Sequence, residues 1–130
     1  MIRQEFHVRK YWKVVVYFNV DYSLFDVILK ELTREGFSED IIGEIKEHME
    51  NGYAKAATIS NVRKHISYIL FNKHSSKIDY INSIVHESVH VKQAMLEAYN
   101  VEDEGESPAY TMGYLVSKIY RIFNKLVEKS

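Results

Sequence analysis

The sequence predicts a single α+β domain spanning residues 1–130, in which a small, mostly antiparallel, three-stranded sheet carries packed helices. Three observations predict this class. Residues 11–20 (YWKVVVYFNV) are a run of β-branched and aromatic residues of strand length. Two more such runs occur within residues 53–72, with a single residue between them. Elsewhere, apolar residues recur every three or four positions, as on the buried face of a helix.

Two short helices are expected after the first strand, residues 11–20. This strand is predicted to be buried, or nearly buried, on both of its faces. The first runs from Tyr22 to Gly36, because glycine ends helices readily. The second begins after Ser38, whose side chain can cap the first turn, and ends at residues 51–52. The expected inward faces are Leu24, Ile28 and Leu32 in the first helix and Ile41, Ile45 and Met49 in the second.

The second half of the chain is expected to begin with an antiparallel hairpin, made of residues 53–61 and 63–72. A third helix begins near Lys77, since Ser76 and Asp79 resemble a capping box, and ends near residue 100. A fourth helix runs antiparallel to it, from the acidic segment 102–107 to near the C-terminus. The expected inward faces are Ile78, Ile81, Val85 and Val89 in the third helix and Met112, Leu115, Val116, Ile119, Ile122, Phe123 and Leu126 in the fourth.

Composition narrows the classes of partner and of metal site. With 17 basic and 18 acidic residues, the chain has no overall field that favours nucleic acid or an anionic membrane, so neither is expected as a partner. The chain has no cysteine, so any metal must be bound by His, Asp or Glu. No apolar run approaches the length of a membrane span, and we expect a soluble, cytoplasmic protein. The sequence does not indicate the oligomeric state.

The segment HESVH at residues 86–90 lies in the middle of the third predicted helix. Residues four apart project from one side of a helix, so His86 and His90 can bind one Zn²⁺. Glu87 is placed to contact a water molecule on the metal, as a general base does. The alternative is that both histidines are partly buried and satisfied by hydrogen bonds. The motif predicts a zinc site.

The third zinc ligand is expected to be a carboxylate that follows the third helix. A longer motif would need Gly at 93 and His at 96, where the chain has Gln93 and Leu96. The candidates are therefore Glu102, Asp103, Glu104 and Glu106. We choose Glu106, because proline at 108 favours a helix start near residues 104–105 and places Glu106 at its head. Small residues, Ala109 and Gly113, would let this helix approach the histidine helix closely.

The combination of NSIVHESVH (82–90) with GESPAY (105–110) resembles the minimal gluzincin-type zinc metallopeptidases. This class includes small bacterial and phage-borne proteins with HExxH followed by E-x-x-A-Y. The resemblance covers residues 53–123, and TISN at 58–61 is also similar; proline at 108 departs from the pattern. It implies a zincin-like active helix beside a three-stranded sheet, zinc ligands His86, His90 and Glu106, and Glu87 as catalytic base.

The expected function is zinc-dependent hydrolysis of peptide bonds in a peptide or protein substrate. The substrate would add as a strand to the sheet edge. Tyr110 would donate a hydrogen bond to the tetrahedral oxyanion or to Glu106, although plain packing is an equal explanation for one of ten tyrosines. The competing hypothesis is a non-catalytic binding module on the same scaffold.

Overall fold

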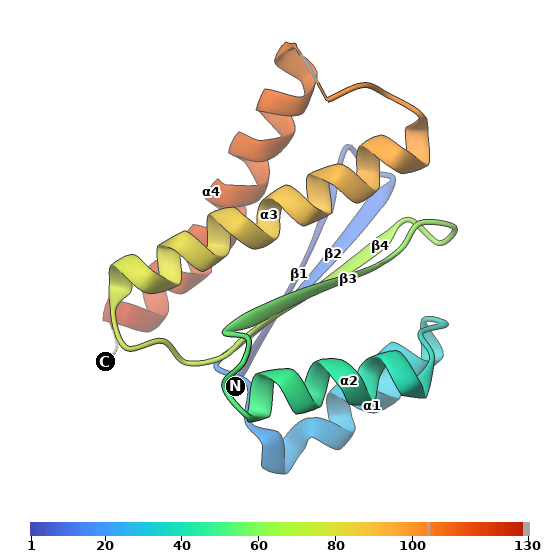
Figure 1. Ribbon diagram of the computed structural model, residues 1–130. Helices are drawn as coiled ribbons and strands as arrows, with labels where there is room; N and C mark the ends of the chain where they lie inside the picture. The colour runs from blue at the N-terminus through green and yellow to red at the C-terminus, as the bar shows by residue number, and fades with distance from the viewer. Residues whose placement is uncertain (104, 129–130) are drawn as a thin grey trace.

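A four-stranded sheet carries helices on both faces in the computed structural model (Figure 1), which describes residues 1–103 and 105–128. The strand order is β1-β2-β4-β3, with bounds Ile2–Val8, Trp12–Phe18, Ala56–Asn61 and Ile66–Phe71 for β1 to β4. β1 pairs with β2, and β3 with β4, in antiparallel fashion, whereas β2 and β4 are parallel. The fold is α+β, as predicted. Within the described ranges, no helix is long and apolar enough to cross a membrane.

The prediction of three strands was wrong, because β1 was missed. Its sequence, IRQEFHV, buries only Phe6 and Val8, so it lacks the continuous apolar pattern of β2. As an edge strand it is stabilised by pairing along its whole length with β2, from Ile2 opposite Phe18 to Val8 opposite Trp12. The parallel pairing of β2 with β4 was also not predicted. Parallel strands need a long crossover connection, which the two helices between them supply.

Two helices cover each face of the sheet (Figure 1). A short 3-10 turn, Tyr22–Leu24, leads into α1 (Phe25–Arg34), and α2 (Glu39–Glu50) follows on the same face. The opposite face carries α3 (Lys77–Tyr99) and α4 (Glu106–Glu128). These two helices run antiparallel, as expected, since Tyr80 near the start of α3 packs its ring 4.6 Å from that of Phe123 near the end of α4.

The predicted starts of α2 and α3 are confirmed by their caps, whereas α1 begins at Phe25, after a 3-10 turn at the predicted start, Tyr22. The Ser38 hydroxyl accepts a hydrogen bond from the Ile41 amide at 3.3 Å, and the Ser76 hydroxyl accepts one from the Asp79 amide at 3.1 Å. Gly36, after the end of α1, has a φ of +92°, which residues with a Cβ rarely adopt. α4 begins at Glu106, one residue later than the predicted range.

A hydrophobic core lies on each side of the sheet. Alternate residues of β2 point to opposite faces, which explains its unbroken apolar run. Under α3 and α4 lie Phe6, Val8, Trp12, Val14, Val16, Phe18, Ile69, Phe71, Tyr80, Ile84, Val91, Ala94, Met95, Leu115, Ile119 and Phe123. Under α1 and α2 lie Val15, Tyr17, Phe25, Ile28, Leu32, Phe37, Ile42, Met49, Ile66, Tyr68 and Leu70.

The predicted inward faces of the first three helices need correction. Leu24 lies in the 3-10 turn before α1 and is 47% exposed. In α2, Ile42 is buried and Ile41 is 48% exposed. In α3, Ile78 is 73% exposed and Val85 is 41% exposed, so the predicted stripe is not the buried one. The buried residues of α3 are Tyr80, Ile84, Glu87, Ser88, Val91, Ala94 and Met95. This face includes polar residues, which a search for apolar periodicity alone passes over.

The buried polar side chains of α3 form hydrogen bonds, which offset the free-energy cost of removing them from water. The Ser88 hydroxyl donates to the Ile84 carbonyl at 2.7 Å. The Glu87 carboxylate accepts from Thr58. Burying either group without a partner would be costly.

Candidate metal and catalytic site

The two histidines of the HESVH segment project together from α3 into solvent. The Nε2 atoms of His86 and His90 lie 3.3 Å apart, with the ring planes at 76°. Two ligand nitrogens on one tetrahedral Zn²⁺, each at roughly 2.0 to 2.1 Å, are separated by about 3.3 Å. The same spacing also permits a hydrogen bond between the two rings. The pair therefore has the separation and the donor type of a zinc half-site.

Glu87 lies beside the histidines but points toward the sheet. Its residue is only 6% exposed, and its Oε1 atom accepts a hydrogen bond from the Thr58 hydroxyl at 2.8 Å. Its other oxygen, Oε2, lies 3.8 Å from Nε2 of His86. The carboxylate thus has one oxygen bound to β3 and one oxygen facing the histidine pair. The role of Glu87 as a general base stays a prediction.

The strand β3 forms the edge of the sheet next to α3. The Lys55 carbonyl accepts a hydrogen bond from the Asn72 amide at 2.9 Å, and by alternation Ala57 also turns its backbone toward β4. The backbone N–H and C=O groups of Ala56, Thr58 and Ser60 consequently point out of the sheet. An unpaired edge of this kind can accept another strand.

Contacts along β3 show that α3 follows this edge. Lys55, just before β3, forms an ion pair with Asp79 in the first turn of α3 at 2.6 Å. Thr58 then contacts Glu87, two turns farther along the helix. The histidine pair consequently lies beside the outward-pointing backbone of β3.

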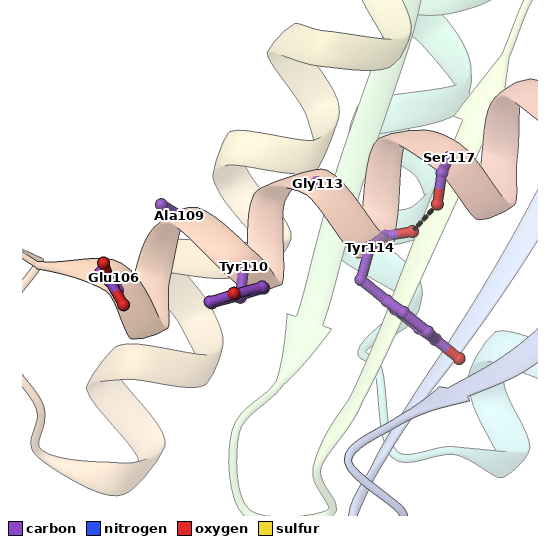
Figure 2. Close-up of a pocket in the computed structure, with 6 residues that line it drawn as sticks. All are labelled: Glu106, Ala109, Tyr110, Gly113, Tyr114 and Ser117. Carbon is purple, nitrogen blue, oxygen red and sulfur yellow. Dashed lines mark hydrogen bonds between the residues drawn. The ribbon is translucent and has the colours of Figure 1, made fainter.

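Glu106 and Tyr110 lie on a different surface. Both line an open groove of about 570 Å³ on α4, together with Ala109, Gly113, Tyr114 and Ser117 (Figure 2). Glu106 is exposed, and Tyr110 is 72% exposed. Ala109 and Gly113 do not face α3, contrary to the prediction: both are exposed, and a Cβ added to Gly113 would meet no atom within 4 Å. The expected close approach of the two helices at these residues is therefore absent from this structure.

The described residues contain no cluster of three or more His, Asp or Glu side chains placed to bind one metal ion. The structure brings together His86, Glu87 and His90, and it leaves Glu106 apart from them. Of the other candidates, Asp103 pairs with Lys92 at 2.9 Å, Glu102 is exposed, and Glu104 lies outside the described residues. The identity of the third ligand stays a prediction.

Comparisons of the chain with models of protein families, with curated proteins and with solved structures find no match. Imidazole nitrogens and carboxylate oxygens are donors that suit Zn²⁺, and the histidine spacing fits that ion. Thr58 is the functional candidate that sequence reasoning missed. Its strand was predicted, but its contact with Glu87 joins residues 29 positions apart.

Proposed function

We propose that the protein is a zinc-dependent metallopeptidase of the gluzincin type. The observation that carries the proposal is the 3.3 Å separation of the His86 and His90 Nε2 atoms, with the buried Glu87 carboxylate beside them. His86 and His90 would bind the metal, with Glu106 as the third ligand. Bound zinc lowers the pKa of a coordinated water to about 7 and polarises a carbonyl group.

Ligation by Glu106 requires the first turn of α4 to approach α3. The connection between the helices contains two residues with positive φ, Asn100 at 53° and Gly105 at 90°, on either side of a short loop. Metal binding often completes the ordering of its own ligands, and zinc can supply the free energy for such an adjustment. Tyr110, one turn after Glu106, would move with it and donate a hydrogen bond to the substrate oxyanion.

Glu87 is proposed as the general base and acid. Its Oε2 atom, on the side of the histidines, would take a proton from the attacking water and deliver it to the leaving amine nitrogen. Its Oε1 atom stays bound to Thr58. A positioned group of this kind typically contributes about 10² to 10⁴ in rate.

The proposed substrate is a polypeptide segment in extended conformation. It would add as a strand to β3, pairing with the outward N–H and C=O groups of Ala56, Thr58 and Ser60. The hydrogen bond between Thr58 and Glu87 supports this proposal, because it joins the edge strand to the carboxylate that is proposed as the base. Because the pairing uses backbone groups, it would select an extended chain more than a particular sequence.

A second candidate function is peptide binding without hydrolysis. It is favoured by one observation, namely that no third ligand joins His86 and His90 within the part of the chain that the structure describes. Two histidines alone bind zinc weakly, and the β3 edge can accept a peptide whether or not it is cleaved.

The test is the zinc content and activity of protein purified without a histidine tag. The peptidase proposal predicts about one zinc per chain by elemental analysis, as in other single-zinc enzymes. It also predicts cleavage of extended peptides that a chelator abolishes and added zinc restores. Peptides that bind but stay intact in the zinc-loaded protein would favour the binding module.

A further inference from the structure

Thr58 is half-buried in the middle of β3 and contacts Glu87 twice. Its hydroxyl oxygen lies 2.8 Å from Oε1 of the carboxylate and 3.4 Å from the Glu87 carbonyl oxygen. A hydroxyl has one proton to donate, and the shorter distance assigns it to the carboxylate. Among the described residues, Thr58 is the hydrogen-bond donor to the side chain of Glu87.

A glutamate used as a base needs such a partner, because its side chain has several rotatable bonds. Catalytic groups act efficiently only when their geometry is maintained within about 0.5 Å and 10–20°. The Thr58 bond engages Oε1, so that Oε2 is the oxygen left to face the histidines, 3.8 Å from Nε2 of His86. It also offsets the cost of burying a carboxylate that is 6% exposed.

We propose that Thr58 is a positioning residue for Glu87, an inference that rests on the proposed peptidase function. The backbone of Thr58 points outward from the sheet edge while its side chain binds the base. One residue would then pair with the substrate backbone and orient the carboxylate. The position of the base is thereby tied to the register of the bound peptide.

Ser60 offers a matched comparison within the same strand. It lies two residues along, on the same side of β3, and its backbone also points outward. Its hydroxyl, however, hydrogen-bonds with that of Ser67 at 2.7 Å, away from Glu87. Removing the Ser60 hydroxyl therefore perturbs the edge strand without touching the base.

The kinetic test compares Thr58→Val, Thr58→Ser and Ser60→Ala on one cleaved peptide. Valine keeps the shape and the strand backbone, so KM should stay within about 2-fold, while kcat falls about 10- to 100-fold, as for other groups that orient a catalytic residue. Serine keeps the hydroxyl and should restore kcat to within about 3-fold of wild type. Ser60→Ala should lower kcat far less than Thr58→Val does, because it perturbs the same edge strand without removing a contact of Glu87. Wild-type kcat in Thr58→Val, or a loss confined to KM, would overturn the positioning role.

A stability measurement tests the contact apart from catalysis. Thr58→Val should lower the Tm of the wild type by several degrees, and by much less in a Glu87→Ala background, where no carboxylate is left unpaired. An equal loss of Tm in the wild type and in the Glu87→Ala variant would show that Thr58 does not stabilise the protein through Glu87. A third outcome separates the contact from the function. If the Tm loss of Thr58→Val depends on Glu87 but the zinc-loaded protein cleaves no peptide, the contact between the two residues stands. The proposed peptidase function, and with it the catalytic role of Thr58, would then be overturned.

Discussion

The Nε2 atoms of His86 and His90 lie 3.3 Å apart on the exposed side of α3. The spacing of four residues along one helix produces this approach, because such residues lie one above the other. The pair is exposed, whereas Glu87 between them is buried and bound to the neighbouring strand. The helix thus directs the two histidines toward solvent and the carboxylate toward β3.

Zinc binding should depend on both histidines of this pair. His86→Ala or His90→Ala removes one ligand of the proposed site and should lower zinc content from about one per chain to near zero. Elemental analysis of dialysed, untagged protein measures this. His48→Ala, an exposed histidine on α2 across the sheet, is the control and should keep its zinc. If the His86→Ala, His90→Ala double variant kept the zinc content of the wild type, the proposed zinc site would be wrong.

Glu106 should be the carboxylate to which zinc affinity is sensitive. If it completes the site, Glu106→Ala should weaken zinc binding by about 10- to 100-fold or more, since a ligand is lost outright. Glu102→Ala, an exposed neighbour in the preceding loop, should leave affinity unchanged. Competition with a chromophoric chelator gives both affinities. Equal affinities for the two variants would exclude Glu106 as a ligand and would leave the identity of the third donor to other residues.

Acid should destabilise the protein partly through Glu31 on α1. Burial acts to raise the pKa of this carboxyl group, but hydrogen bonds from Arg3, Tyr17 and Tyr68 prevail and lower it from 4.5 to about 2. Since the folded pKa lies below the unfolded one, the resulting stability is present above about pH 4.5 and is lost as the pH falls toward 2. The Tm of the wild type should therefore drop more between pH 5 and pH 2.5 than that of Glu31→Gln.

The control for this pH dependence is Glu44→Gln, an exposed carboxylate on α2. This variant should lose Tm with acid as steeply as the wild type does. A Glu31→Gln profile as steep as that of wild type would show that the contacts of Glu31 with Arg3, which include a 2.6 Å ion pair, do not contribute to acid sensitivity.

The sequence predicts those features of the structure that depend on residues close together in the chain. The hairpin of β3 and β4, the caps at Ser38 and Ser76, and the extent of α3 were predicted from residues close together in the chain, and the structure confirms them. β1 was missed because an edge strand needs no apolar run when its partner supplies the pairing.

The candidate site was predicted in part for the same reason. The histidine spacing is a local property of one helix, so it can be inferred from five residues. The buried face of α3 was misjudged because Glu87 and Ser88 belong to it, and their burial depends on partners such as Thr58 that lie far away in sequence. The placement of Glu106 depends on how α4 packs, and no local pattern determines that.

The most direct test of the peptidase account is peptide hydrolysis by Glu87→Gln, with zinc content measured in the same samples. Glutamine preserves the size of the side chain and can still accept the hydrogen bond from Thr58, but it cannot take up a proton at neutral pH. The account predicts unchanged zinc content and a loss of about 10² to 10⁴ in kcat, while Glu97→Gln on the same helix retains wild-type activity. Cleavage by Glu87→Gln at the wild-type rate would contradict it.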